Sequence, residues 1–303
     1  MKRWAALIGI VALGVAALVL SETRRVGTPV SPAALLRWLA GAQREITRVP
    51  AAATRLSDDK EIRIGDELAY EYTMGWQVAQ QDPSARIVQA YVELIGARVA
   101  GRAHRKLPYK FHYIPDRNFI NAFALPGGHV FIGGGLIALM DSEDELAAVL
   151  GHEVEHIDHY HCAERVQIEA ALRKIPLGGL VGLPIEVFEA GYSKDQEMEA
   201  DREGTRLAVW AGYSPLGAIR MFEAFDRLYR ERVTQPRSPG QELSRMALQA
   251  LQGYFRSHPP APERIEEIRR LIRENRWENL VSERKLEVAD VFRARPTESS
   301  SRK

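Results

Sequence analysis

The chain has 303 residues, with 41 Lys and Arg against 40 Asp and Glu, and a formal net charge of +1 at pH 7. This balance argues against nucleic acid as the main partner, because proteins that bind nucleic acid usually carry a clear basic excess. The single cysteine, Cys162, excludes an internal disulfide framework and a cysteine-rich metal site.

The N-terminus begins with Met-Lys-Arg and continues as an uncharged apolar run over residues 4–20. As a helix this run would span roughly 25 Å, slightly less than the hydrocarbon core of a bilayer. It fits a cleaved signal peptide or an uncleaved anchor, and we favour the anchor because the run is longer than most signal-peptide centres. In both cases we expect the rest of the chain to be exported. The predicted domains are an anchor or signal sequence at 1–21, a tether at 22–60, a folded domain at 61–295 and a disordered tail at 296–303.

The folded domain is predicted to begin with two helices between residues 60 and 105, separated at QQDPSA. Asp82 is the expected N-cap of the second helix, with Pro83 at its first position. A later helix over 141–161 starts with Ser142 and Glu145 in the spacing of a capping box. Three further segments have helical patterns: SKDQEMEADREGTRLAVWAG, SPLGAIRMFEAFDRLYRE and APERIEEIRRLIREN.

Three short segments, 109–115, 118–124 and 129–133, are rich in aromatic and β-branched residues, which is typical of strands. The letters LPGG between the last two indicate a turn. The sequence therefore predicts a mostly helical α+β domain with one small mixed sheet.

The stretch AAVLGHEVEHIDHYH, residues 147–161, holds four of the eight histidines of the chain. His152 and His156 are four residues apart, so on a helix they lie on one face, where two imidazoles can bind one metal ion. Glu153 projects beside them and can hold the water that a metal activates, which is the H-E-x-x-H arrangement. We expect His159 and His161 to be structural residues at the end of this helix, close to the negative end of its dipole.

A catalytic zinc needs a third protein ligand and an open position. The segment KDQEMEADREG provides Glu197 and Asp201 on one face of another helix. One of the two carboxylates can bind the metal, while the other can accept the free N–H of a ligand histidine. Two imidazoles and a carboxylate suit zinc, although ligand type alone does not exclude other divalent ions.

Several segments together resemble one family. HEVEH followed by EMEAD, the strand segment NAFALPGGHVFIGGGLI and the segment SHPPAPERIEEI are similar to the gluzincin metallopeptidases of the HtpX and CAAX-prenyl-protease type. The resemblance covers roughly residues 65 to 275. A single N-terminal apolar run looks more like the periplasmic BepA- and LoiP-like branch, or the mitochondrial quality-control peptidases, than like the multi-span members.

The resemblance implies a zincin-like fold and one Zn²⁺ per chain. It implies that His152, His156 and Glu197 bind the zinc, that Glu153 is the general base and then the acid, and that Asp201 supports a ligand histidine.

His258 stands before two prolines, which by itself indicates a surface loop. The resemblance makes it a candidate for the site, either as a donor to the oxyanion or as a latency switch that closes the fourth zinc position. Tyr192 is a second candidate oxyanion donor. The strand around Asn121, Ala122 and Phe123 is a candidate edge strand, which would pair with the backbone of an extended substrate.

These observations predict a membrane-tethered zinc metalloendopeptidase that hydrolyses misfolded or damaged proteins. The catalytic domain is expected on the periplasmic side of a bacterial inner membrane, with the mitochondrial intermembrane side as the alternative. The rival hypothesis is a chaperone or assembly factor that binds client chains and has latent or minor proteolytic activity. Both hypotheses expect unfolded polypeptides as partners, and the sequence indicates no oligomeric state.

Overall fold

The structure of the protein is a computed structural model, which describes residues 56–173, 192–230, 258, 262–280 and 284–293. The predicted anchor, all but the last few residues of the tether and the predicted tail lie outside these residues. Among the described residues, no helix is both long enough and apolar enough to cross a membrane.

Two helices open the described part of the chain, as predicted. Helix α3 (Asp58–Met74) is followed by the short 3-10 helix η1 (Ala79–Gln81) and by α4 (Pro83–Ala100). The side chain of Asp82 accepts a hydrogen bond of 2.7 Å from the backbone N–H of Ser84. This cap satisfies one of the N–H groups that a helix start leaves without a partner, so the predicted start of α4 is confirmed.

In the part of the chain that the structure describes, the sheet has three strands, β1 (Lys110–Ile114), β2 (Ala122–Leu125) and β3 (His129–Gly133), in the order β1-β3-β2. β1 is parallel to β3 and β2 is antiparallel to it, so the predicted small mixed sheet is confirmed. The second strand starts at Ala122 rather than at residue 118. It lies at one edge of the sheet that the described residues form.

The turn between β2 and β3 is the 3-10 helix η2 (Pro126–Gly128), where sequence predicted a turn. Gly127 has φ of 77°, a left-handed conformation that side chains rarely adopt. A Cβ atom on Gly127 would also lie 2.5 Å from the Cα of Ile62 in α3. This glycine therefore permits both the turn and its close contact with α3.

The helix that carries His152 and His156 starts after Ser142, as predicted, but ends earlier than predicted. After the short helix α5 (Gly134–Ile137), α6 spans Glu143–Asp158 and α7 spans His161–Arg173, so the predicted single helix to residue 161 is wrong. The break is at Tyr160, a non-glycine residue with φ of 62°. The guanidinium of Arg105 lies over the ring of Tyr160, with its central carbon 3.8 Å from the ring centroid. This cation–π contact stabilises the turn.

The predicted capping box at the start of α6 is also wrong. Ser142 occupies the N-cap position but accepts no capping hydrogen bond, and its hydroxyl donates instead to Glu145. The reason is tertiary, because the backbone N–H of Glu143 donates to the carbonyl of Arg284 and Ser142 pairs with Lys285 in an isolated bridge. A chain segment about 140 residues away therefore replaces the local cap.

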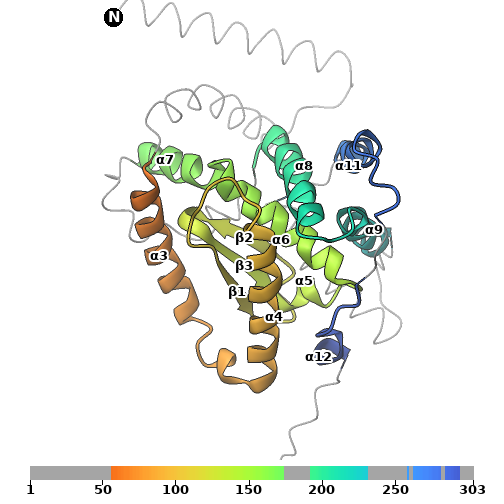
Figure 1. Ribbon diagram of the computed structural model, residues 1–303. Helices are drawn as coiled ribbons and strands as arrows, with labels where there is room; N and C mark the ends of the chain where they lie inside the picture. The colour runs from red at the N-terminus through yellow and green to blue at the C-terminus, as the bar shows by residue number, and fades with distance from the viewer. Residues whose placement is uncertain (1–55, 174–191, 231–257, 259–261, 281–283, 294–303) are drawn as a thin grey trace, which may run out of the picture. The chain divides into compact units, whose positions relative to one another are not determined.

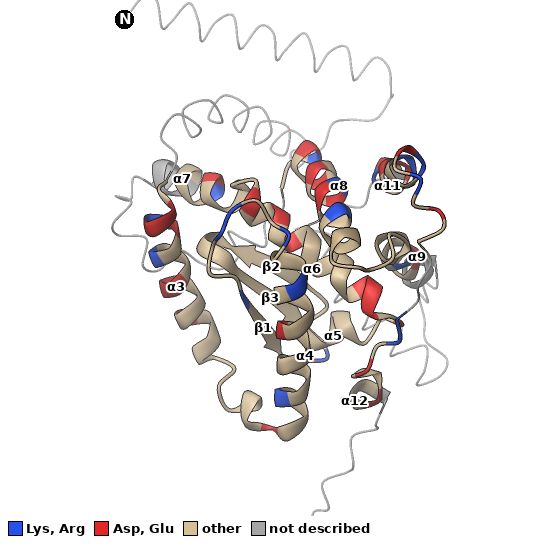
Figure 2. Ribbon diagram, viewed as in Figure 1, with Lys and Arg blue, Asp and Glu red and all other residues tan. Residues whose placement is uncertain are grey.

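Four more helices follow among the described residues: α8 (Lys194–Trp210), α9 (Leu216–Arg230), α11 (Pro262–Glu274) and α12 (Ala289–Arg293). α8 packs along α6, and α11 packs against α8 and α9 (Figure 1). Acidic and basic residues are frequent on α8 and α11, while the strands of the sheet carry few (Figure 2). The helices thus separate the sheet and α6 from the charged surface.

Alternate residues of each strand enter two hydrophobic cores, as expected for a sheet covered on both faces. One face packs with α4 and α6, and contributes Phe111, Tyr113, Ala122, Ala124, Val130 and Ile132. The opposite face packs with α3 and α7, and contributes Ile114, Phe123, Leu125 and Phe131.

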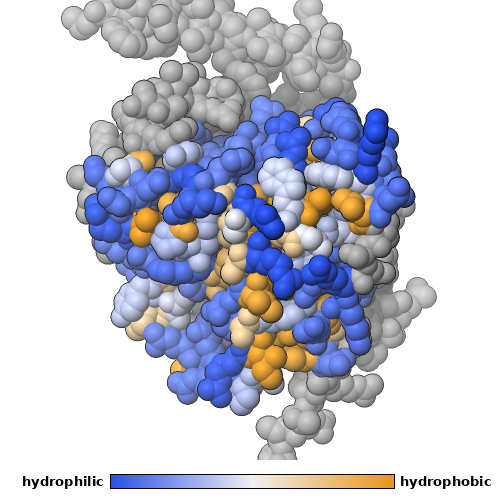
Figure 3. Space-filling view, in the orientation of Figure 1, coloured by the Kyte–Doolittle hydropathy of each residue, from blue (hydrophilic) through white to orange (hydrophobic). Residues whose placement is uncertain are grey.

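The outer surface of the face shown in Figure 3 is mostly hydrophilic, with small hydrophobic patches. The large apolar side chains that are exposed among the described residues are Tyr70, Met74, Val78, Ile87, Leu94, Trp210 and Leu280.

Candidate metal centre

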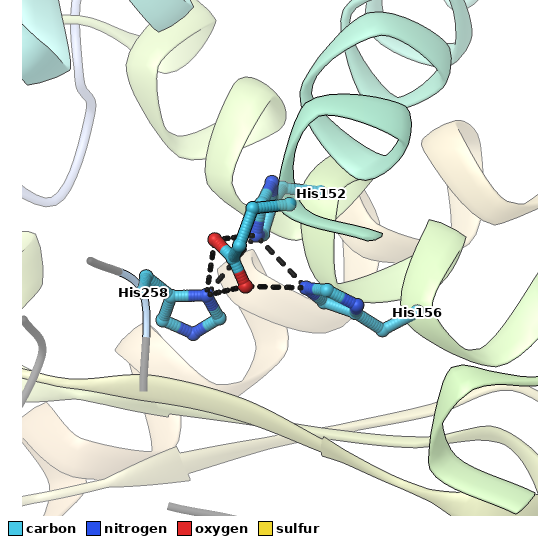
Figure 4. A group of neighbouring side chains, drawn as sticks. His152, His156 and His258 are labelled. Atoms are coloured by element: carbon cyan, nitrogen blue, oxygen red, sulfur yellow. Dashed lines mark hydrogen bonds and ion pairs between the residues drawn. The ribbon is translucent and has the colours of Figure 1, made fainter. Parts of the chain in front are cut away.

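Four side chains from three parts of the fold meet in the interior beside α6. His152 and His156 extend from α6, Glu197 from α8, and His258 from a separate segment, and one ligand atom of each lies within 4.8 Å of the others. Figure 4 shows the three histidines pointing toward one another around a carboxylate. All four residues are buried. The predicted ligands His152, His156 and Glu197 are therefore brought together, and His258 joins them.

Glycines bring α6 and α8 close enough for this meeting. A Cβ atom on Gly151 would lie 2.6 Å from the carbonyl oxygen of Gly204, and one on Gly204 would lie 2.6 Å from the backbone nitrogen of His152. The two helix backbones touch at this crossing. Glu197 lies two helical turns before Gly204 on α8, so the crossing sets its distance from the histidines.

The nitrogens that would bind a metal are identified by their neighbours. Nε2 of His152 and Nε2 of His156 are 3.0 Å apart and face the cluster. Nδ1 of His152 lies 2.9 Å from Oδ1 of Asp201, which therefore accepts the N–H of the opposite side of the ring. This is the arrangement predicted for Asp201, and it fixes the tautomer that leaves the Nε2 lone pair of His152 for a metal.

Arg264 is a site residue that sequence reasoning missed. It is buried in α11, and its guanidinium lies 3.0 Å from Oε2 of Glu197 and 2.5 Å and 2.8 Å from the two oxygens of Asp201. The available signal was the segment SHPPAPERIEEI, in which Arg264 follows His258 by six residues. Arg264 compensates part of the negative charge that the carboxylates bring into the interior.

The pKa shifts of His156 and Glu197 agree with the binding of a cation by these two residues. Burial lowers the pKa of His156 well below its usual value, which keeps the imidazole neutral. Burial alone would raise the pKa of Glu197, but the neighbouring His258 and Arg264 lower it well below the usual range. Neutral imidazoles and an ionised carboxylate are the forms that bind zinc.

Glu153 lies next to this donor set without a hydrogen bond. It is fully buried, and neither of its carboxylate oxygens has a hydrogen-bond partner among the described residues. Burial raises the pKa of its carboxyl group. A buried polar group without partners is costly, so these oxygens favour a water or substrate atom beside them. Donors and orphaned carboxylate together fit a zinc site with an adjacent general base.

His258 bridges the donor set and the sheet. Its Nδ1 lies 3.1 Å from Nε2 of His152 and 3.2 Å from each oxygen of Glu197. Its Nε2 lies 3.3 Å from Oε1 of Glu153 and 3.4 Å from the carbonyl oxygen of Ala122. Nδ1 thus reaches the metal position, while Nε2 reaches the carboxylate of Glu153 and the edge strand β2.

Tyr192 and the edge strand border the same cluster. The ring of Tyr192 stacks on His156 with centroids 3.7 Å apart, and its hydroxyl lies 3.2 Å from Sγ of Cys162. Just before β2, the carbonyl of Asn121 accepts a hydrogen bond from the backbone N–H of Gly133, and in β2 the carbonyl of Ala122 faces His258. Phe123 is buried against Phe131 in the core. The roles predicted for these residues in catalysis and substrate binding stay predictions.

The sequence pattern of peptidase family M48 matches residues 85–272, which is more than half of the chain and includes every residue of the cluster. The chain is 33% identical over 202 residues to a putative beta-barrel assembly-enhancing protease of Vibrio cholerae, a match that covers 59% of the chain and 40% of the relative. It is 28% identical to the beta-barrel assembly-enhancing protease of Yersinia pestis, over 62% of the chain and 42% of the relative.

A mitochondrial relative is also similar. The chain is 31% identical to the mitochondrial metalloendopeptidase OMA1 of Schizosaccharomyces pombe, over 56% of the chain and 53% of the relative. The matches therefore span about two fifths to one half of the length of these relatives.

Proposed function

Since this chain belongs to peptidase family M48, whose metallopeptidases depend on zinc, we propose that it is a zinc endopeptidase acting on misfolded or damaged proteins. The observation that carries the proposal is the buried cluster of His152, His156 and Glu197 with the orphaned carboxylate of Glu153 beside it. Quality control as the role is supported by the family and by the similarity to the bacterial and mitochondrial proteases.

His152, His156 and Glu197 would hold the zinc ion, which supplies a Lewis acid that polarises the scissile carbonyl and acidifies water. Asp201 keeps the proton of His152 on Nδ1, so that Nε2 presents its lone pair to the ion. Glu153 accepts a proton from the attacking water as the new C–O bond forms. It then delivers this proton to the amine nitrogen as the C–N bond breaks.

The raised pKa of Glu153 suits both steps. Burial shifts the pKa of the carboxyl group toward neutral pH, where the group must accept and then release a proton. Its oxygens accept no hydrogen bond from the described residues, and the ion-pair contact of Oε1 with His258 would be exchanged for a contact with water once His258 moves. These features support Glu153 as the general base, in the position that the H-E-x-x-H arrangement predicts.

We assign His258 the role of a latency switch. Its Nδ1 sits among the donor atoms of the cluster, where it would occupy the position that a substrate carbonyl or water needs. Its Nε2 side contacts the carbonyl of Ala122, the group that an incoming peptide would use to pair with β2. In this position His258 would therefore block a substrate twice, at the metal and at the carbonyl of Ala122. Movement of His258 would open both.

The substrate is proposed to bind as an added strand at β2. Pairing through backbone groups recognises extended chain rather than a particular sequence, which suits unfolded proteins as substrates. The proposed location is the exported side of a membrane, with the apolar run at 4–20 as tether. That run supports this location.

The test compares the wild-type full-length chain with Glu153→Gln and His258→Ala for zinc content and for cleavage of unfolded casein. Glu153→Gln is expected to keep stoichiometric zinc and lose at least about a thousandfold in activity, because the base and acid are removed while the ligands remain. His258→Ala is expected to cleave casein faster than the wild type. A wild type without zinc, or an active Glu153→Gln, would contradict the proposal.

A client-binding chaperone is the second candidate function, and the buried position of His258 is the observation that favours it. A permanently blocked metal would leave β2 as a binding edge only. This alternative expects stoichiometric zinc and casein binding in all three proteins, with no cleavage even by His258→Ala.

A further inference from the structure

We propose that His161, backed by Glu199, is a positioning residue that fixes the ring of His156 for metal binding. The inference rests on the proposed zinc site. From its sequence position His161 is expected to be a structural residue at a helix end, yet its Nδ1 lies 3.0 Å from Nδ1 of His156. On its other side, Nε2 of His161 lies 3.2 Å from Oε2 of Glu199.

The hydrogen-bond geometry defines one arrangement of protons. Nε2 of His156 faces the cluster and must present a lone pair to a metal, so its proton belongs on Nδ1. Two ring nitrogens at 3.0 Å need one N–H and one lone pair, so Nδ1 of His161 is the acceptor. The proton of His161 then lies on Nε2 and donates to Glu199. Every donor in this series meets an acceptor.

The two ligand histidines are thus supported in different ways. His152 donates directly to the buried carboxylate of Asp201, whereas His156 reaches the half-exposed carboxylate of Glu199 through an intervening imidazole. The interior already holds the carboxylates of Glu153, Glu197 and Asp201. Another buried charge directly behind His156 would be costly, and an imidazole bridge avoids it by leaving the carboxylate at the surface.

The backbone supplies a second, independent observation. Tyr160 adopts the left-handed φ of 62°, a conformation that is strained for a non-glycine residue. This single residue ends α6 and starts α7, and so brings His161 back beside His156. Arg105 stabilises the turn in two ways. Its guanidinium donates a hydrogen bond of 2.7 Å to the carbonyl oxygen of Ile157, and it lies over the ring of Tyr160. The strained conformation of Tyr160 is retained because it places His161 in contact with His156.

Tyr192 completes the support of His156. Its ring lies parallel to the imidazole, at an interplanar angle of 13°, and Arg165 covers the ring within 4.2 Å of its centroid. The stack fixes the plane of the imidazole, while the hydrogen bond from Nδ1 fixes its rotation within that plane. Both are needed to aim Nε2 at one point.

The experiment measures the zinc affinity of the metal-free full-length chain by competition with a chromophoric chelator. His161→Leu removes the acceptor, and we expect it to weaken zinc binding by about 10- to 100-fold. His161→Asn places its side-chain oxygen near the position of Nδ1, so we expect its affinity to stay within about threefold of the wild type. Glu199→Ala is expected to fall between the two.

His159→Asn is the matched control. His159 contacts Glu199 and Glu155 but does not support a ligand, so its replacement is expected to leave the zinc affinity unchanged. Urea unfolding of each metal-free variant separates weakened binding from loss of the fold. In addition, ¹⁵N NMR of the metal-free chain should show His156 with its proton on Nδ1 in the wild type, and a mixture of tautomers in His161→Leu.

A His161→Leu chain that binds zinc as tightly as the wild type, or a His161→Asn chain as weak as His161→Leu, would overturn the proposal. A wild type that binds no zinc would instead overturn the proposed function. The tautomer of His156 still tests the hydrogen bond in that case, and an unchanged tautomer in His161→Leu would exclude a positioning role.

Discussion

Arg264 determines how the site tolerates its negative charge. It is the buried cation that contacts both Glu197 and Asp201, and its guanidinium also lies 4.8 Å from the ring centroid of Phe222. The neighbouring charge of Arg264 helps to lower the pKa of Asp201, whose burial alone would raise it. Without Arg264, two carboxylates would remain in the interior with less compensation.

We therefore expect Arg264→Met to reduce the unfolding free energy of the metal-free protein by about 3–5 kcal/mol, the usual effect of removing one partner of a buried ion pair. Arg269→Met is the matched control on the same helix, because Arg269 is exposed and pairs with Glu266 at the surface. Urea denaturation measures both variants. Equal midpoints would show that Arg264 does not stabilise the buried carboxylates.

At the scale of elements, the crossing of α6 and α8 assembles the site. α6 provides two histidines and Glu153, and α8 provides Glu197, Asp201 and Glu199. Their backbones touch at Gly151 and Gly204, where a side chain on either residue would meet backbone atoms rather than a flexible group. The distance between the helices is therefore set by two missing side chains.

Gly204→Ala should push α8 away from α6. We expect it to lower the unfolding free energy by about 1–3 kcal/mol, because an added methyl group meets backbone that cannot yield easily. Zinc affinity should fall as well, since Glu197 moves with α8. Gly75→Ala is the control, because its Cβ would lie 3.6 Å from the nearest carbonyl in an ordinary helical conformation. A Gly204→Ala chain with normal zinc affinity would refute this role of the crossing.

At the scale of the whole molecule, the sheet contains a second histidine pair that affects stability rather than the site. Nε2 of His112 lies 2.9 Å from Nδ1 of His129, and Nε2 of His129 lies 3.0 Å from Asp66, which also pairs with Lys110. Burial, with the nearby charges of His129 and Lys110, lowers the pKa of His112 to about 4. Burial also lowers the pKa of His129, although Asp66 opposes the shift.

Stability is therefore expected to fall as the pH drops from about 6.5 toward 4. In this window the unfolded chain binds a proton at His112 that the folded chain does not, so protonation favours unfolding, by on the order of 2–3 kcal/mol at the lower end. His112→Gln keeps a donor toward His129 but does not titrate. Urea midpoints between pH 4 and 7 should thus vary less for His112→Gln than for the wild type. Equal slopes would exclude His112 as a source of the dependence.

Much of the fold and of the candidate site follows from local sequence. The start of α4 at Asp82 and Pro83, the three short strands, and the pairing of His152 with His156 all depend on residues within one helical turn or one strand, where spacing determines direction. The family and its metallopeptidase character follow from the same segments, and the comparisons confirm them. Local patterns sufficed because these contacts form between sequence neighbours.

Only the tertiary structure placed the remaining residues. His258 is 106 residues from His152, and Arg264 is 63 residues from Asp201, so no spacing rule connects them. His161 is close in sequence to His156, but its contact depends on the left-handed turn at Tyr160, which the continuous helical pattern concealed. Sequence determined which groups are able to bind a metal, because that is a property of residue type and helical spacing. The packing of α6, α7, α8 and α11 decided which charges and hydrogen bonds surround them, because burial brings together residues that sequence keeps apart.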